Sequence, residues 1–210
     1  MTPDVAGLGA RIDAGDLTLE PLAIEHAEAL ARAFVDDELW TWMISAAPRG
    51  PAGTQAWIAD ALARAAAGEH VTFVVRLPDG RLAGTTRYLD IRLVDAAVEI
   101  GWTLVFAHAR GGWINARVKS LLLERAFACG FERVTFKTDA RNARSRAAIA
   151  ALGAHFEGVL RAYQRRHDGT LRDTAMFSVL AAEWPGVRTA LDARVRSRRD
   201  RSLANAMEKT

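Results

Sequence analysis

A pair of glycines lies where the chain is expected to pass from a strand into a long helix. Arg110, Gly111 and Gly112 come between a strand expected over 96–106 and a helix expected over 114–130. The first backbone N–H groups of a helix have no partners within it and favour an anion, and glycine lets a phosphate approach the main chain closely. The turn is therefore a candidate diphosphate-binding site, with a plain turn before a helix as the alternative. The sequence has neither the three-glycine dinucleotide fingerprint nor the lysine-containing P-loop, which argues against NAD and ATP.

The same strand carries an acidic residue that could move a proton. Strand alternation predicts an apolar face made of Val98, Ile100 and Trp102. The opposite face would consist of Glu99, Gly101, Thr103 and Val105. Glu99 is therefore a candidate general base, with pairing to a neighbouring strand as the alternative.

The composition is that of an ordinary globular domain. The chain has 210 residues, of which 50% are hydrophobic, and a net charge of +3. Its single cysteine, Cys129, excludes an internal disulfide and suits a reducing cytoplasm. We expect a cytoplasmic protein without signal peptide or membrane span, and no metal site because the five histidines lack ligand spacing.

The hydrophobic spacing predicts an α/β chain. A strand over 17–24 precedes helices over 26–36 and after Pro51, where Thr54 is the expected cap and Gly68 the terminator. Strands are then expected over 70–77, 81–91 and 96–106, followed by helix 114–130, strand 133–140, helix 142–152, two strands flanking Asp168-Gly169, and a helix from Pro185. This order predicts a mixed, mostly antiparallel sheet of about seven strands flanked by helices, with one crossover joining parallel neighbours.

Four segments between about residues 17 and 184 are distinctive when taken together. They are the Glu-Ile-Gly-Trp strand, the Arg-Gly-Gly turn, the Lys-Thr-Asp…Asn-x-x-Ser helix start and the Gly-Ala-x-Phe-Glu-Gly segment. In this combination the sequence resembles the GNAT superfamily of N-acetyltransferases, and in particular its RimJ/RimL-like branch. The resemblance implies a GNAT-like sheet in which acetyl-CoA, the acyl donor, lies in a cleft between two splayed parallel strands.

The resemblance also implies which residues contact acetyl-CoA. Thr103 and Val105 would pair with the pantetheine arm. The diphosphate would lie on the turn formed by Arg110, Gly111, Gly112, Trp113, Ile114 and Asn115. Trp113 departs from the family pattern, which has glycine at that position.

The helix over 142–152 is implied to lie near the thioester. Asn142 would touch CoA or cap the helix, and Ser145 would serve as the acid near the sulfur or face solvent. Arg146 would meet the CoA phosphates or be solvated. The helix contains no tyrosine that could replace Ser145; the two tyrosines of the chain are Tyr88 and Tyr163.

The reaction implied by the resemblance is direct attack of a primary amine on the thioester, with Glu99 acting through a water. An α-amine, with a pKa near ~7.7–8.0, needs less help from a base than a lysine near ~10.4. Trp40, Trp42 and Tyr88 are the candidate acceptor-binding residues, with core packing as the alternative. The acceptor itself, a protein N-terminus or a small-molecule amine, is not indicated by the sequence.

The C-terminal segment is strongly basic. Five arginines fall between Arg194 and Arg201, and we divide the chain into an acyltransferase domain over 1–193 and a basic tail over 194–210. Without interleaved aromatic residues, nucleic-acid binding is not expected. A catalytically inactive CoA-binding or ribosome-associated module is the alternative function, and a homodimer is implied only by the resemblance.

Overall fold

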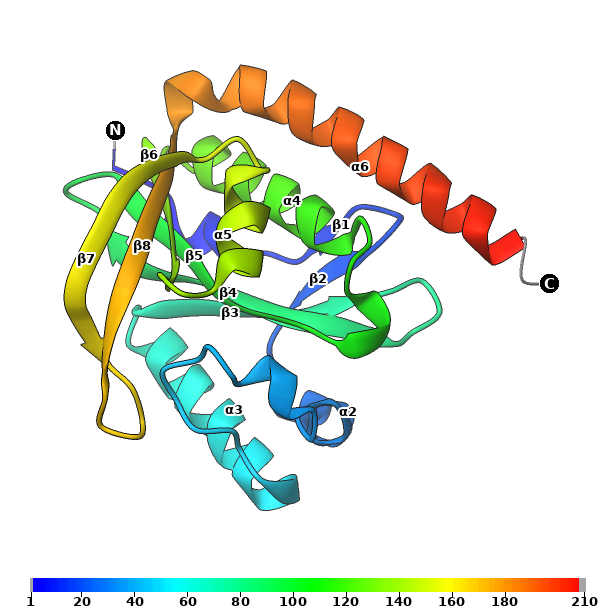
Figure 1. The fold of residues 1–210 in the computed structure, drawn as a ribbon, viewed down its shortest axis with the longest axis vertical. Coiled ribbons are helices and arrows are strands. Elements are labelled where there is room, and N and C mark those ends of the chain that lie inside the picture. Colours follow the sequence, from blue (N-terminus) through cyan, green and yellow to red (C-terminus); the bar gives the residue numbers. More distant parts are fainter. Residues whose placement is uncertain (1, 208–210) are drawn as a thin grey trace.

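The structure is a computed structural model that describes residues 2–207 (Figure 1). Its α-helices are α1 (Val5–Leu8), α2 (Ala27–Ala33), α3 (Gly50–Ala66), α4 (Ile114–Ala128), α5 (Ala143–Ala150) and α6 (Trp184–Met207). Its strands are β1 (Ile12–Asp13), β2 (Thr18–Pro21), β3 (His70–Arg76), β4 (Leu82–Arg92), β5 (Ala97–Val105), β6 (Arg133–Asp139), β7 (His155–Arg165) and β8 (Leu171–Leu180).

The strands of the described residues form one eight-stranded sheet. Its order is β1-β2-β3-β4-β5-β6-β8-β7, and every neighbouring pair is antiparallel except β5 with β6. The parallel pair is joined by α4, which confirms the predicted mixed sheet with one helical crossover. The additional strand, β1, has only two residues, too few for alternation to reveal it in the sequence.

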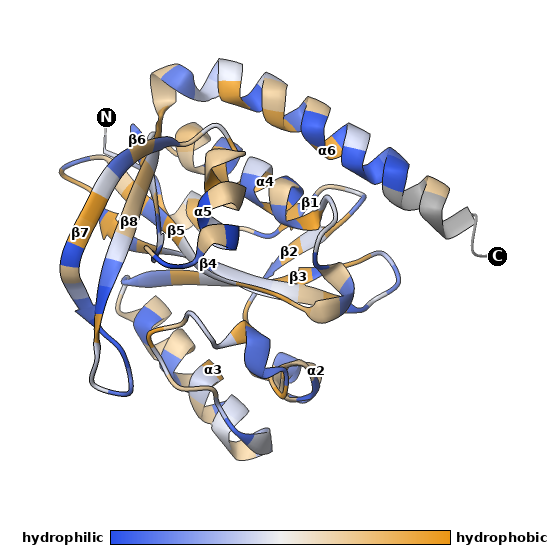
Figure 2. Cartoon of the chain, in the orientation of Figure 1, coloured by the Kyte–Doolittle hydropathy of each residue, from blue (hydrophilic) through white to orange (hydrophobic). Residues whose placement is uncertain are grey.

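Helices cover both faces of the sheet (Figure 1). On one face, α2 and α3 pack over a core that includes Leu30, Phe34 and Ile58. On the other, α4, α5 and α6 cover a larger core that contains Leu122 and Phe136. Hydrophilic residues extend along much of α6 (Figure 2). The site described below lies where the sheet opens between these two layers.

Helix α3 begins earlier than the sequence predicted. Its first residue is Gly50, with Pro51 in the first turn, where the missing N–H of proline costs nothing. Thr54 is therefore not the cap: it is buried inside the helix, and its Oγ1 donates to the carbonyl of Gly50 at 3.0 Å. The expected terminator is confirmed, since Gly68 follows the helix with a φ of +74°.

The arginine-rich segment belongs to α6. The helix continues through Arg194 to Met207, and Leu191 and Val195 pack into the same core as α4. This burial places one side of the segment against the domain. Residues 208–210 of the expected tail lie outside the described residues.

Candidate active site

The two parallel strands separate soon after they pair. β5 and β6 are in register over three residue pairs, the last being Glu99 with Thr135, although β5 continues to Val105 and β6 to Asp139. A cleft of about 610 Å³ lies between the diverging ends. Among the described residues, the β6 side of β5 beyond Glu99 has no strand partner. Its backbone groups can therefore pair with an extended ligand.

A bulge in β5 changes which side chains face each layer. Trp102 has a φ of +48°, and the pairing with β4 shifts beside it. One extra residue reverses the alternation beyond it. Thr103 and Val105 consequently face α4, whereas Glu99 faces the layer of α2 and α3. The expectation that these three side chains share a face is therefore wrong.

A buried cation supports the bulge. The guanidinium of Arg87 lies between the rings of Trp57 and Trp102, 5.3 and 4.4 Å from their centroids, and its Nη1 is 3.1 Å from His70 Nδ1. Burial lowers the pKa of Arg87 to about 10 and that of His70 to about 4. A neutral histidine accepts the hydrogen bond from the arginine, and this contact helps to hold Trp102 in place.

The predicted phosphate turn has the geometry that an anion requires. Gly111 has a φ of +76° and open space where a side chain would lie. Helix α4 has no side-chain N-cap and no acidic residue in its first turn. Asn115 lines the cleft, and its Oδ1 is buried without a hydrogen-bond partner among the described residues. The uncapped backbone amides of α4 fit a bound diphosphate, whereas Asn115 Oδ1 is an acceptor and fits a donor group of a ligand.

The tryptophan in this turn does not block it. Trp113 packs against the core beside α4, and Arg199 lies over its ring at 5.4 Å from the centroid. Ile114 packs against the same core. Contrary to expectation, neither side chain lines the cleft, whereas Arg110, Gly111, Gly112 and Asn115 do.

Ion pairs join the two sides of the cleft. Arg110 follows β5 and contacts Asp36 at 2.6 Å and Glu38 at 2.7 Å, while its Nε donates to the carbonyl of Val105. Glu38 also binds Arg144 of α5 at 2.6 Å. The guanidinium of Arg110 is thus committed to carboxylates, which leaves its loop to hold a phosphate through backbone amides.

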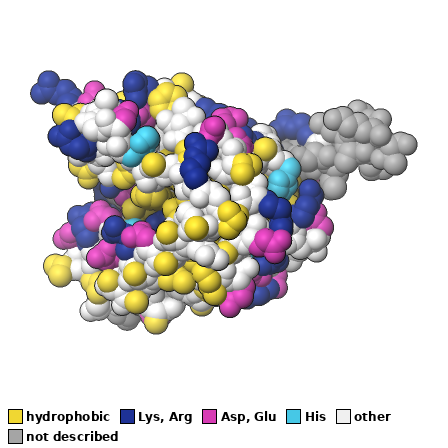
Figure 3. Space-filling model, turned by 90° about the horizontal axis from the view of Figure 1, so that it is seen from below, with side chains coloured by type: hydrophobic (Ala, Val, Ile, Leu, Met, Phe, Trp, Pro, Cys, Tyr) yellow, Lys and Arg dark blue, Asp and Glu magenta, His cyan; other side chains and the backbone are white. Residues whose placement is uncertain are grey.

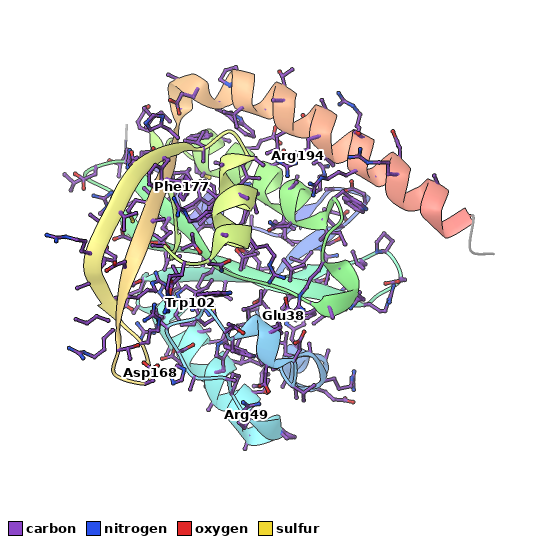
Figure 4. The ribbon with its side chains drawn as sticks, viewed as in Figure 1. Glu38, Arg49, Trp102, Asp168, Phe177 and Arg194 are labelled. Carbon is purple, nitrogen blue, oxygen red and sulfur yellow. The ribbon has the colours of Figure 1, made fainter. Side chains whose placement is uncertain are left out.

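Arginines of α6 reach the same turn. Arg194 and Arg198 line the cleft, and Arg198 Nη1 donates to the carbonyl of Gly112 at 3.3 Å. Burial and the nearby Arg198 lower the pKa of Arg194, because two close cations repel each other. Arg194 lies on α6, on the opposite side of the sheet from Glu38 (Figure 4). The position of these arginines in the cleft was not predicted from the sequence, although the arginine run drew attention to the segment.

Helix α5 lines the cleft through Arg144, Ser145, Ala147, Ala148 and Ile149. Asn142 is its N-cap and accepts a hydrogen bond from the amide of Ser145 at 2.9 Å. Asn142 and Ser145 both line the cleft. Arg146 does not: it donates to the carbonyl of Ala140 at 3.1 Å and stacks over Phe156.

Two of the three acceptor candidates lie in the cores. Tyr88 is fully buried and donates to the carbonyl of Leu122 at 2.5 Å, and Trp40 is 6% exposed with its indole N–H donating to Phe34. Neither lines the cleft, contrary to expectation, because apolar burial outweighs their polar atoms. Trp42 does line it, with Arg141 over its ring.

The face toward α2 and α3 carries the candidate base. Glu99 is 4% exposed, and Lys137 Nζ lies 2.6 Å from its Oε2. The contact with Lys137 is an ion pair, and Oε2 accepts no hydrogen bond from the described residues. Burial raises the pKa of Glu99, and the positive charge of Lys137 only partly offsets this rise. Burial alone would lower the pKa of Lys137, but the nearby Glu99 carboxylate raises it above its ordinary value. Gly101 leaves room for this carboxylate, because a Cβ there would lie 2.7 Å from Glu99 Oε1.

A second lysine lines the cleft from the α4 side. Lys119 is 5% exposed, with Nζ 2.5 Å from Thr103 Oγ1 and 3.3 Å from Thr86 Oγ1. Its polar partners are neutral, and burial lowers its pKa to about 7. No sequence pattern marks Lys119, because its burial depends on how α4 packs on the sheet.

The acceptor end of the cleft combines apolar and charged side chains. Trp42, Met43, Ile44 and Leu89 line it together with Gln164 and Arg172. Figure 3 shows the surface of the molecule on the side of α3, where hydrophobic side chains are spread widely and acidic and basic ones gather at the edges. Trp102 of β5 lies on the side of the molecule where the β7–β8 hairpin carries Asp168 at its tip (Figure 4).

Comparison with protein families identifies this fold and cleft. The family model described as an acetyltransferase (GNAT) domain matches residues 16–155. The chain belongs to the GNAT acetyltransferase family. This membership confirms the family predicted from the four motif segments, and with it an acyl-CoA-dependent N-acetyltransferase.

Solved GNAT structures resemble the chain over most of its length. An acetyltransferase structure from T. thermophilus shares 38% identity, with 88% of this chain and 96% of that one covered and a TM-score of 0.78. A GCN5-related N-acetyltransferase from Brucella melitensis shares 26% identity over 93% and 89%, with a TM-score of 0.83. Mycobacterium smegmatis RimJ, solved in complex with CoA-disulfide, has the same fold at 24% identity, covering 92% and 97%, with a TM-score of 0.77. A search of curated proteins found no match.

The described part of this GNAT chain contains neither a helix suited to crossing a membrane nor a cluster of side chains suited to a metal ion. None of its helices has the length and apolar character needed to cross a membrane. Among residues 2–207, no group of three or more His, Cys, Asp or Glu side chains is arranged to hold a metal ion.

Proposed function

We propose that this GNAT domain transfers the acetyl group of acetyl-CoA to a primary amine by direct attack on the thioester, with Glu99 as the proton acceptor. The observation that carries the proposal is the buried Glu99 carboxylate at the point where β5 and β6 separate. The base and the unpaired backbone of β5 thus border one cleft.

The residues along the cleft fit the donor. The backbone amides at the start of α4 and the arginines of α6 would hold the phosphates, since each offers donors or positive charge. The β5 backbone beyond Glu99 would pair with the pantetheine arm. When bound, acetyl-CoA supplies an activated acyl group whose carbonyl carbon is attacked by an amine.

Proton removal would take place on the face of β5 that is turned toward α2 and α3, where Glu99 lies. A lysine-type acceptor with a pKa near ~10.4 costs about 5 kcal/mol to deprotonate at pH 7, whereas an α-amine near ~8 costs about 1 kcal/mol. The raised pKa of Glu99 makes its carboxylate a stronger base than an exposed glutamate. Glu99 would accept the proton directly or through a water, and Lys137 would hold the carboxylate in place.

Ser145 is the proposed proton donor to the leaving thiolate. It lines the cleft at the first turn of α5, where the Asn142 cap fixes the helix start. The hydroxyl of Ser145 makes no hydrogen bond to another described residue, which leaves it available to a ligand. Ser145→Ala should lower turnover without changing acetyl-CoA binding.

Two measurements test the proposal in order. Calorimetric titration with acetyl-CoA and with free CoA should give saturable binding. A thiol-release assay over a panel of α-amines, polyamines and lysine-type amines should then show turnover. Glu99→Gln should lower the rate for lysine-type amines and leave only the rise with pH that comes from deprotonation of the amine itself. Glu28→Gln, an exposed control on α2, should keep the wild-type rate and pH profile.

The outcomes separate the two functions considered for the chain. Turnover that depends on Glu99 supports the proposed acetyl transfer. Tight CoA binding without turnover on any amine would show that the domain is an inactive CoA-binding module. Equal pH profiles of wild type and Glu99→Gln would remove the role assigned to that carboxylate.

A further inference from the structure

A buried arginine stands at the acceptor end of the cleft without an acidic partner. Arg172 of β8 is 7% exposed and lines the cleft together with Gln164 of β7. Its Nε donates to Thr174 Oγ1 at 3.1 Å and its Nη2 to Gln164 Oε1 at 2.5 Å. Within residues 2–207, no carboxylate forms an ion pair with Arg172, and its Nη1 donates no hydrogen bond.

Two carboxylates that act on Arg172, Asp139 and Glu99, already have cationic partners. Asp139 binds both Arg141 and Arg166, and Glu99 binds the lysine described above. These carboxylates act on Arg172 only over longer distances. The ion-pair network beside Arg172 therefore contains more cations than carboxylates before any ligand binds.

This arrangement is costly unless an anion completes it. Taking a charged group out of water costs several kcal/mol, and hydrogen bonds to a hydroxyl and an amide satisfy donors without cancelling the charge. Burial accordingly lowers the pKa of Arg172. Thr174 and Gln164 fix two edges of the guanidinium, which leaves Nη1 uncommitted beside the cleft. A fixed guanidinium with an uncommitted donor suits a carboxylate ligand.

We propose that Arg172 binds a carboxylate carried by one of the two reactants. The inference rests on the acetyl or acyl transfer proposed above and names the substrate class of that site. The carboxylate belongs either to the acceptor, which would then be an amino acid or peptide with an acid near its amine, or to the far end of the acyl group. Both sources present the same chemistry to Arg172.

Matched pairs of ligands distinguish the two sources. L-alanine and L-alaninamide differ as acceptors by one carboxylate, and succinyl-CoA and acetyl-CoA differ in the same way as donors. Each ligand is measured in the thiol-release assay with wild type, with Arg172→Gln, and with Arg161→Gln, an exposed control on β7. Because the ratio within each pair is compared between proteins, the different basicity of the two amines cancels.

A charge-assisted hydrogen bond of this kind should contribute about 10- to 100-fold. Wild type and Arg161→Gln should favour the acid-bearing member of one pair by that factor, relative to Arg172→Gln. A shift confined to the acceptor pair or to the donor pair identifies the source. Unchanged ratios in both pairs would overturn the proposal.

Calorimetry makes the test independent of turnover. Alanine and alaninamide are titrated into CoA-saturated wild type, and the two acyl-CoA molecules into the ligand-free protein. A preference for the acid-bearing ligand without thiol release would support carboxylate binding while acetyl transfer fails. If Arg172→Gln does not fold, the wild-type binding ratios decide alone, and equal affinities within both pairs would refute the proposal.

Discussion

Replacement of Lys119 by methionine tests how strongly the cleft wall desolvates a cation. The pKa of Lys119 is lowered from 10.5 to about 7, because Nζ is buried against two threonine hydroxyls and the ring of Phe136. A group that binds its proton about 3.5 pH units less tightly when folded costs up to about 5 kcal/mol of stability. Methionine keeps the length of the side chain. The substitution also leaves neither threonine without a hydrogen-bond partner, because Thr86 and Thr103 lie within hydrogen-bond distance of each other.

The sign of the pH dependence follows from the depressed pKa. Between about pH 7 and 10.5 the unfolded chain holds this proton and the folded chain does not, so the stability of the wild type rises with pH. Below about pH 7 both states are protonated and the full penalty remains. The free energy of unfolding of wild type relative to Lys119→Met should therefore increase by about 2 kcal/mol from pH 7 to pH 9.

Urea unfolding followed by tryptophan fluorescence at several pH values measures this difference. Groups shared by both proteins, such as Cys129, cancel in the comparison. Arg32→Met removes an exposed cation from α2 and should show no trend over the same range. A difference between wild type and Lys119→Met that stays constant from pH 7 to pH 9 would refute the reasoning, because Lys119 would then keep an ordinary pKa.

Three further outcomes are expected. Gly84→Ala should destabilise the fold by about 2–4 kcal/mol in thermal or urea unfolding, because a Cβ there would lie 2.2 Å from the carbonyl oxygen of Leu104; a loss below ~0.5 kcal/mol would contradict this packing. Tyr88→Phe should cost about 1 kcal/mol through its lost hydrogen bond and leave the KM for the amine unchanged, whereas a raised KM would restore Tyr88 to the acceptor site. Joint replacement of Arg194 and Arg198 by glutamine should weaken acetyl-CoA binding about tenfold in calorimetry at low salt and less at high salt; unchanged affinity would show that α6 does not contact the phosphates.

The parts of the fold that depend on local patterns could be predicted from the sequence. The strand, glycine turn and helix around Gly111 are encoded in consecutive residues, and the Asn142 cap is a contact across three residues. Glu99 is noticeable in the sequence because a glutamate stands out in an apolar strand, and the structure places it in the lining of the cleft. The number of the main strands and their order along the chain followed from the same local signals.

The rest of the site depends on tertiary packing. Lys119 and Arg172 have ordinary positions in a helix and a strand, and only their burial beside the cleft distinguishes them. The prediction that Tyr88 binds the acceptor was wrong for the same reason, since its sequence context does not reveal that it lies in the core. Trp102 is not a glycine, so nothing in the sequence indicated that its φ is positive and that the faces of β5 exchange.

The bulge at Trp102 makes β5 a strand with two phases. Before it, the odd-numbered side chain of Glu99 faces α2 and α3; after it, the odd-numbered Thr103 and Val105 face α4. Deleting one residue at this point would restore a regular strand but exchange the surroundings of every side chain up to Val105. The number of residues in β5 therefore matters as well as their types, because a single residue decides whether the proposed proton acceptor and the proposed donor-binding side chains lie on opposite faces of the sheet.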